Sequence, residues 1–347
     1  MTDVKNFNVG STNSTKKKGK SLPPKLIIQL GRFVWTTMWQ TMMAKIAPRN
    51  QSGEYIRPSS QLRNFISTEK NSLYPAAAGR YHLYVGLSCP WAHRTLIVRA
   101  LKRLEDVISV TVVVPSAIAG GWVFDQPEED CASLAQLYQL AQPGYSGRAT
   151  VPVLWDKQTK TIVNNESAEI IVMLNSQFNE FALHPTLNLY PDELKEKIDQ
   201  WNEKIYKSVN NGVYRCGFAQ TQQAYNLAID ELFATLDEIE AALETSRYLC
   251  GNHLTLADVR LFTTLFRFDV AYYGLFKCNR HRIQDYPNLG AYLRDMYQLP
   301  GVADTCNLES VKQDYYGNLF PLNPGGIIPS GPDMSYLLKS HDRDRIG

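Results

Sequence analysis

The sequence is poor in three features that mark particular classes of protein. Its six cysteines among 347 residues are too few for the disulfide framework of a small secreted domain. Its 36 Lys and Arg nearly balance its 34 Asp and Glu, and with 44% hydrophobic and 20% charged residues the composition is that of an ordinary globular protein. It also lacks the run of about 18 apolar residues that a membrane-spanning helix needs. We therefore expect no disulfide scaffold and no nucleic-acid partner.

Acidic residues are scarce at the N-terminus. Residues 1–60 contain ten Lys and Arg but only Asp3 and Glu54, so this segment carries +8 and the rest of the chain −6. For residues 26–47 we favour a helix or extended arm docked on the body or on a partner subunit; the alternative is membrane-surface contact through Trp35, Trp39 and the preceding lysines. We expect a cytoplasmic protein without membrane contact, although the acid-poor first twenty residues leave an organellar transit segment open.

The hydrophobic spacing changes at about Pro185. Before it, the pattern predicts strands at 80–87, 107–114, 151–155 and 161–164, helices at 90–104 and 166–178, and a long irregular or helical segment after the second strand. The β-branched run VISVTVVV predicts that the second strand is buried. After it, broad apolar faces predict packed helices at 193–209, 222–243, 255–272 and 288–298.

This layout predicts an α/β domain followed by an all-helical domain. We place a basic extension at 1–68, the α/β domain at 69–185, the helical domain at 186–320 and a C-terminal tail at 321–347. Within the helical part, the order Leu254-Thr255-Leu256-Ala257-Asp258 predicts a helix start with a capping box between Thr255 and Asp258, which is a folding element.

One cysteine has a setting that favours reactivity. Cys89 stands where a strand ends and a helix begins, and Pro90 suits the first helical position. Unpaired backbone N–H groups at a helix start favour the thiolate, which is the reactive form. The other five cysteines have no such setting, and we interpret them as structural. An inert buried cysteine is the alternative for Cys89.

Alanine at position 92 argues against dithiol chemistry at Cys89. A dithiol oxidoreductase would carry cysteine there, as Cys-x-x-Cys, and Cys89 has no such partner. An oxidised Cys89 would have to be reduced by an external thiol, which predicts a mixed disulfide with a small thiol.

The order of Cys89-Pro90, Val151-Pro152 and Glu166-Ser167 resembles the thioredoxin-fold domain of the glutathione transferases. The chain from about residue 80 to about 332 most resembles the glutathionyl-hydroquinone reductases, the Xi class, which is similar to the omega class. The motifs that carry this resemblance are CPWAHRTLIVR, GGWVFD, GRATVPVLWD, IVNNESAEII, GNHLTLADVRLFTTLFRFD and NPGGIIPSGP. It implies a thioredoxin-like domain followed by a helical domain, glutathione as co-substrate, no metal, and a homodimer.

The resemblance also implies a glutathione site. Pro152 matches the cis-proline of the fold, which would turn the backbone of Val151 toward the cysteinyl part of glutathione. Glu166 and Ser167 would bind the γ-glutamyl ammonium and carboxylate at a helix start, with simple capping as the alternative.

Two further residues belong to this implied site. Trp122 matches a tryptophan that covers glutathione in the family, and a core tryptophan is the alternative. Arg148 would help to bind a carboxylate, and a solvated loop arginine is the alternative.

Tyr214 and Tyr315 match tyrosines that line the acceptor pocket of the family, where their phenols would bond the hydroxyls of a hydroquinone. Core tyrosines are the alternative. For Tyr273 and Arg267 we favour packing and an ion pair.

The function implied is reduction of glutathionyl-hydroquinones through a Cys89–glutathione mixed disulfide. Two alternatives stay open: an omega-like thiol transferase or dehydroascorbate reductase, and a non-catalytic binding module on the same fold.

Overall fold

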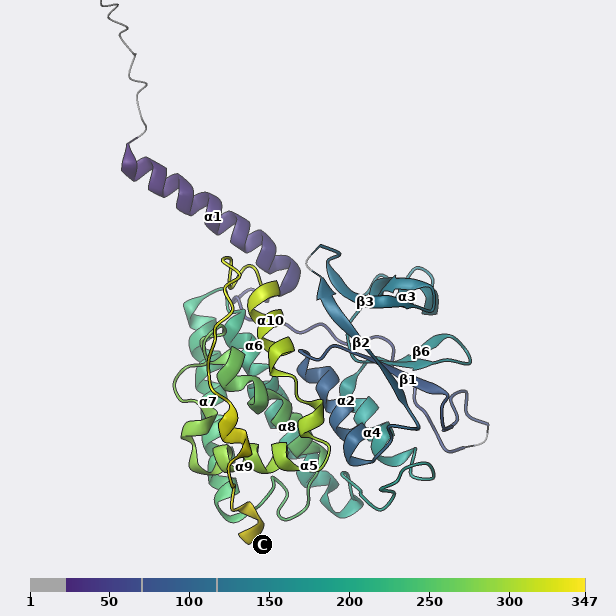
Figure 1. Ribbon diagram of the computed structural model, residues 1–347. Helices are drawn as coiled ribbons and strands as arrows, with labels where there is room; N and C mark the ends of the chain where they lie inside the picture. Colours follow the sequence, from purple (N-terminus) through teal and green to yellow (C-terminus); the bar gives the residue numbers. More distant parts are fainter. Residues whose placement is uncertain (1–22, 70, 117, 347) are drawn as a thin grey trace, which may run out of the picture.

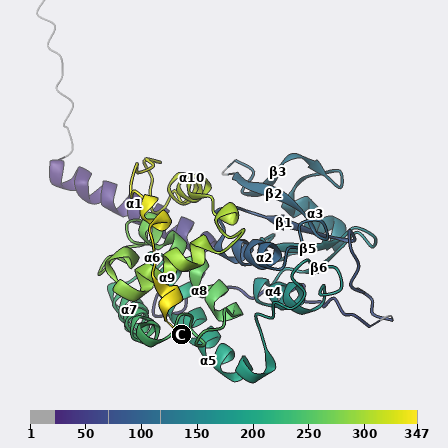
Figure 2. The ribbon, with the colours of Figure 1, turned by 60° about the horizontal axis from the view of Figure 1, so that its bottom comes forward.

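The computed structural model describes residues 23–69, 71–116 and 118–346 (Figure 1). The transit segment considered for the first twenty residues lies outside this part of the chain. The described chain forms an α/β half and a helical half that lie side by side, and a long N-terminal helix extends away from both (Figures 1 and 2).

The α/β half is built on a six-stranded sheet with the strand order β4-β3-β2-β1-β5-β6. Only the β1–β2 pair is parallel; the other neighbouring strands pair antiparallel. The five residues of β1 (YHLYV) are all buried at the centre of the sheet. The strands are β1 (Tyr81–Val85), β2 (Ser109–Ser116), β3 (Gly121–Glu128), β4 (Cys131–Ser133), β5 (Val153–Asp156) and β6 (Thr161–Asn164).

One expectation for this half is wrong, and another is correct only in part. Strand β2 is not a buried strand, because only Val113 of its residues is buried and Val112 and Val114 are 38% and 47% exposed. The segment expected to be irregular or helical contains β3, β4 and a helix, α3 (Leu134–Ala141). Together β3 and β4 widen the sheet beyond β2.

The helices of the α/β half join the two halves. Helix α2 (Pro90–Leu101) packs on α4 (Ser167–Ser176) within its own half and on α8 (Leu256–Arg267) of the other. Eleven of the twelve residues of α2 are buried, so this helix forms the interior joint between the two halves. The predicted domain boundary at 185 and 186 falls in the connection that follows α4.

The helical half contains every helix that the spacing predicts; two are divided, and the other two run one or two residues beyond the predicted bounds. Helices α5 and α8 each continue into a π-helical turn, η2 (Tyr206–Asn210) and η3 (Phe268–Tyr272). Short helices α6 and α10 were not predicted. The α-helices are α5 (Lys195–Ile205), α6 (Gly212–Gly217), α7 (Gln222–Thr245), α8 (Leu256–Arg267), α9 (Pro287–Gln298) and α10 (Leu308–Asn318).

The predicted helix start before α8 has the expected contacts. The Asp258 carboxylate accepts from the backbone N–H of Thr255 at 2.8 Å and of Leu249 at 3.0 Å. The Thr255 hydroxyl also donates to it at 2.8 Å. Asp258 therefore reaches back as predicted and also fixes the preceding loop.

The N-terminal helix α1 (Pro24–Ile46) projects from the body (Figures 1 and 2). Residues 24–38 are all exposed, and Met43 is the only buried residue of the helix. The indole N–H of Trp39 donates to the carbonyl of Pro321 at 3.1 Å. The expected docking on the body is therefore confined to the last turns. None of the helices in the described residues has the length and apolarity to cross a bilayer.

Candidate active site

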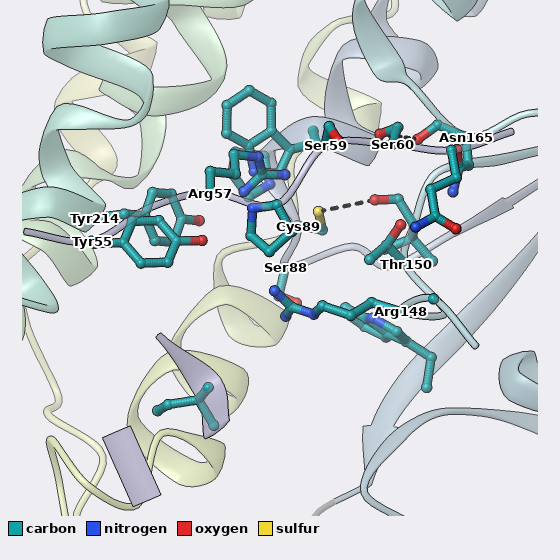
Figure 3. A pocket seen from close by; sticks show the side chains of 18 of the residues that line it. Tyr55, Arg57, Ser59, Ser60, Ser88, Cys89, Arg148, Thr150, Asn165 and Tyr214 are labelled. Atoms are coloured by element: carbon teal, nitrogen blue, oxygen red, sulfur yellow. Dashed lines mark hydrogen bonds between the residues drawn. The ribbon is translucent and has the colours of Figure 1, made fainter. Parts of the chain in front are cut away.

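A pocket of about 540 Å³ opens between the two halves, with Cys89 on its wall (Figure 3). The α/β half, the helical half and the N-terminal extension all contribute to it. Its lining includes Tyr55, Arg57, Ser59, Ser60, Ser88, Cys89, Trp91, Trp122, Arg148, Val151, Asn165, Tyr214, Asp314 and Tyr315.

The Cys89 thiol lies at the start of α2, as predicted. It is the N-cap residue of α2, its side chain is half-buried, and its Sγ lies 3.7 Å from the carbonyl oxygen of Val151. Burial raises the pKa of Cys89 above its usual value. The N–H groups of Ala92 and Trp91 and the positive charges of Arg57 and Arg267 lower it. The sequence reasoning anticipated the helix start and offered burial only as the alternative, whereas the structure combines both effects.

Arg267 holds the loop that carries Cys89. From the end of α8, its guanidinium donates to the carbonyls of Ser88 at 2.8 Å and Leu87 at 3.0 Å. It also donates to Nδ1 of His93 at 3.0 Å and to the carbonyl of Thr263 at 2.9 Å. These partners are not carboxylates, so the expected ion pair is wrong. The side chain instead places a buried positive charge behind the thiol and ties the helical half to the Cys89 loop.

The N-terminal extension supplies a second positive charge. The Arg57 guanidinium lies 3.9 Å from the ring centre of Trp91, and that of Arg94 lies 4.4 Å from it. Cation–π contacts of this kind hold guanidinium groups in place on an aromatic ring. In Figure 3 Arg57 lies beside Cys89 on the side toward Tyr55 and Tyr214.

Three phenols form one cluster on the wall supplied by the helical half. The hydroxyl of Tyr315 lies 2.6 Å from that of Tyr214 and 2.9 Å from that of Tyr272. Tyr214 and Tyr315 line the pocket, and Tyr272 stands fully buried behind them. Burial raises the pKa of all three, so they are neutral hydrogen-bond donors at neutral pH.

The structure brings six of the nine predicted site residues together. Those that line the pocket are Cys89, Trp122, Arg148, Val151, Tyr214 and Tyr315. Arg148 is exposed and extends below Cys89 in the view of Figure 3. The Val151–Pro152 bond is cis, as the resemblance implies, although Pro152 itself lies outside the lining.

Glu166 and Ser167 lie just behind the lining residue Asn165. Glu166 caps α4 by accepting from the N–H of Ala168 at 3.1 Å, and it also accepts from the hydroxyl of Ser60 at 2.9 Å. Ser167 is buried, with its hydroxyl 3.4 Å from the guanidinium of Arg94. The capping contact that the sequence offered as the alternative is therefore present at Glu166.

Trp122 reaches the Cys89 loop because Gly86 has no side chain. A Cβ built at Gly86 would overlap the indole ring of Trp122. The ring is half-buried and lines the pocket beside Ser88. The close approach of a glycine backbone and an indole thus sets one wall of the site.

Sequence reasoning missed several residues of this site. Tyr55, Arg57, Ser59 and Ser60 belong to the extension, which precedes the part of the chain that carries the family resemblance. No local signal marks them, because the contacts that position them are long-range, such as the Leu62 N–H with the Asn165 side chain at 3.2 Å. The sequence also singled out Tyr273 in place of its neighbour Tyr272.

Asp314 was also missed. Its carboxylate accepts a hydrogen bond from the hydroxyl of Ser88, which precedes Cys89. Burial raises the pKa of Asp314, and the hydrogen bonds from Ser88 and Asn318 oppose that effect. Asp314 therefore fixes the Cys89 loop from α10, as Arg267 does from α8.

Two protein-family models match the chain, one in each half. The model of the glutathione S-transferase N-terminal domain matches residues 88–177, and that of the C-terminal domain matches residues 222–295. Glutathionyl-hydroquinone reductase YqjG of Escherichia coli is 45% identical over 331 residues, which covers 91% of this chain and 98% of that protein. The chain belongs to the glutathionyl-hydroquinone reductase family. PcpF of Sphingobium chlorophenolicum, of the same name, is 45% identical over 86% of this chain and 94% of its own length.

Solved structures place this family member in the Xi class. The glutathione transferase Xi of Phanerochaete chrysosporium aligns with a TM-score of 0.80 at 46% identity, covering 84% of this chain and 96% of that one. The glutathione-bound structure of YqjG aligns with a TM-score of 0.77 at 47% identity, covering 82% and 96%. The thioredoxin-like domain followed by a helical domain is therefore confirmed.

In the part of this Xi-class chain that the structure describes, no group of three His, Cys, Asp or Glu side chains is arranged to hold a metal ion.

Proposed function

We propose that the protein reduces glutathionyl-hydroquinones to hydroquinones with glutathione as co-substrate. The observation that carries this proposal is the Cys89 thiol at a helix start, facing a pocket that also presents the phenols of Tyr214 and Tyr315. The names of its relatives and the glutathione-bound neighbour support the same activity.

In the first step, the Cys89 thiolate attacks the sulfur of the glutathionyl-hydroquinone. A Cys89–glutathione disulfide forms and the sulfur–carbon bond breaks. The bond's electron pair goes to the ring carbon, which takes a proton, and hydroquinone leaves. In the second step, the thiolate of a second glutathione attacks the glutathionyl sulfur of the mixed disulfide. Oxidised glutathione leaves and the Cys89 thiolate returns, which gives ping-pong kinetics.

We assign roles to the remaining site residues on their positions. Val151 offers its backbone to the cysteinyl part of glutathione beside Cys89, and Pro152 follows it. Trp122 covers the bound tripeptide, and Arg148 meets one of its carboxylates.

Glu166 and Ser167 at the start of α4 receive the γ-glutamyl group. For Glu166 this means exchanging the hydrogen bond from Ser60 for one from the ligand ammonium.

Tyr214 and Tyr315 bind the hydroxyls of the hydroquinone ring. Because their pKa values are raised, both keep a proton to donate at neutral pH. Tyr272, behind them, accepts or donates within the cluster and keeps the two phenols aligned.

The decisive experiment compares the parent protein with Cys89→Ser. Incubation with a glutathionyl-hydroquinone should add one glutathione to the intact mass of the parent and release hydroquinone. In Cys89→Ser the adduct should vanish and turnover should fall about a thousandfold or more. Cys306→Ser, which changes the other half-buried thiol, is the matched control and should retain activity. Turnover of Cys89→Ser at the parent rate would overturn the mechanism.

Parallel assays separate the alternatives. A thiol transferase or dehydroascorbate reductase would turn over a glutathionylated peptide or dehydroascorbate faster than the glutathionyl-hydroquinone. A binding module would bind glutathione and turn over none of them. We also propose that the protein is a cytoplasmic homodimer. The domain limits at 68, 185 and 320 remain predictions.

A further inference from the structure

We infer that helix α1 lies on an anionic lipid surface. This inference concerns a surface outside the pocket and does not depend on the proposed reaction. It departs from our expectation for residues 26–47, which favours docking on the body or on a partner subunit over contact with a membrane surface.

The first observation is the apolar surface that α1 leaves uncovered. Eight large apolar side chains between Leu26 and Met38 are 46–70% exposed, and Phe33 is the most exposed at 70%. They are Leu26, Ile27, Ile28, Leu30, Phe33, Val34, Trp35 and Met38. The helix stands clear of the body along this length (Figures 1 and 2). A continuous apolar surface of this kind marks an interaction site.

The second observation is the arrangement of polar residues on α1. Lys25, Gln29, Arg32, Thr36 and Gln40 follow one another at spacings of three and four, so they form one polar stripe along the helix. Apolar side chains occupy most of the remaining circumference. A helix that pairs with a single partner helix needs only a narrow apolar seam, whereas a helix lying in a lipid interface keeps a polar stripe toward water.

The hydroxyls outside this stripe are satisfied within the helix. Thr37 donates to the carbonyl of Phe33 at 2.9 Å, and Thr41 donates to the carbonyl of Thr37 at 2.9 Å. A hydroxyl bonded to its own helix loses less on leaving water. Thr37 and Thr41 are therefore compatible with contact between this surface and lipid.

The third observation is charge, and it selects the partner. Residues 4–53 contain nine Lys and Arg and no Asp or Glu. Three of these cations, Lys25, Arg32 and Lys45, stand on α1 itself. Two copies of α1 would bring like charges together, whereas anionic lipid headgroups complement them. Trp35, which is 49% exposed, is of the aromatic type that favours the headgroup level.

The test is flotation of the full chain with vesicles of phosphatidylcholine alone and of phosphatidylcholine with phosphatidylglycerol. We expect binding to the anionic vesicles, weaker binding at high salt, and little binding to the neutral ones. The double variant Phe33→Glu/Trp35→Glu should lower the partition coefficient tenfold or more. Leu183→Glu, which adds a charge at another exposed apolar residue, is the matched control and should bind like the parent.

Two further readouts keep the result interpretable. Turnover of a water-soluble substrate should be equal in the parent and both variants, because none of these residues lines the pocket. The mass in solution by light scattering should also be unchanged. Failure of the parent to float with anionic vesicles would overturn the inference. Loss of a parent dimer in Phe33→Glu/Trp35→Glu would overturn it too, by showing that a second copy covers α1.

Discussion

At the scale of single residues, the thiol of Cys89 lies under opposing influences. Burial raises its pKa, and two backbone N–H groups and two guanidinium groups lower it. One of these cations, Arg267, is fully buried and bonded on all sides, so its position is fixed. The other, Arg57, is half-buried and lies outside the helices and strands. Its removal should therefore change the surroundings of the thiol without disturbing the core.

Replacing Arg57 by alanine should raise the pKa of Cys89, because a nearby positive charge favours the thiolate. The pH at which iodoacetamide alkylation of Cys89 is half-maximal should move upward, and the rate at neutral pH should fall several-fold. Arg57→Lys should restore part of the rate. Arg63→Ala removes a different cation of the extension, one paired with Glu169, and should leave the profile in place. An unchanged profile in Arg57→Ala would refute this role.

At the scale of elements, α8 does two separate tasks at its two ends. Its start is held by Asp258, whose buried carboxylate also accepts from the phenol of Tyr292 at 3.0 Å. Its end places Arg267 against the Cys89 loop. The start serves the stability of the helical half, and the end serves the site.

Asp258→Ala should lower the free energy of unfolding by about 2–4 kcal/mol, because it leaves the buried N–H groups of Leu249 and Thr255 without an acceptor. Asp258→Asn keeps one acceptor oxygen and should lose less. Urea unfolding followed by circular dichroism measures both values. A smaller loss in the alanine variant than in the asparagine variant would contradict the account.

The strands and helices also show which parts of the fold can be predicted from the sequence. Strand β6 has the predicted bounds, Thr161–Asn164. Its short apolar, β-branched run can be recognised from neighbouring residues alone. Strand β3 was missed because Gly121, Asp125 and Pro127 hide its pattern, and its partner β2 supplies the pairing. Tyr272 was missed because it ends the π-helical turn η3. This turn changes the regular helical spacing, so the spacing does not predict which of Tyr272 and Tyr273 faces the cluster.

The candidate site divides in the same way. Cys89, Val151 and Trp122 stand in motifs that sequence can recognise. The Arg57 loop and Asp314 reach the pocket only through long-range packing, for which neighbouring residues give no signal.

At the scale of the whole molecule, the two halves meet around a neutral histidine. Arg267 can only donate, so Nδ1 of His93 accepts, and its Nε2 lies 2.9 Å from the hydroxyl of Thr305. Burial, and then the charge of Arg267, hold the pKa of His93 well below its usual value. Protonation would place a second cation beside Arg267 in the joint between the halves.

Acid should therefore destabilise the protein through this buried imidazole. His82 in β1 adds to the effect, since burial lowers its pKa to about 4. For both histidines the unfolded chain binds a proton more readily, so stability falls as the pH drops below about 6.5. His82 alone should cost about 2 kcal/mol between about pH 7.5 and about pH 5. His82→Phe, measured by urea unfolding across this range, should flatten the dependence by that amount; an equal slope in both proteins would argue against it.

The last residue of α1, Ile46, lines the same pocket as Cys89. With α1 on a lipid surface, the pocket would open near the C-terminal end of that helix and so close to the bilayer. Aromatic substrates that partition into lipid would then reach Cys89 by a two-dimensional search along the membrane, while glutathione would arrive from the water on the other side. The rate with lipid-soluble substrates would depend on the amount of substrate per unit of membrane area.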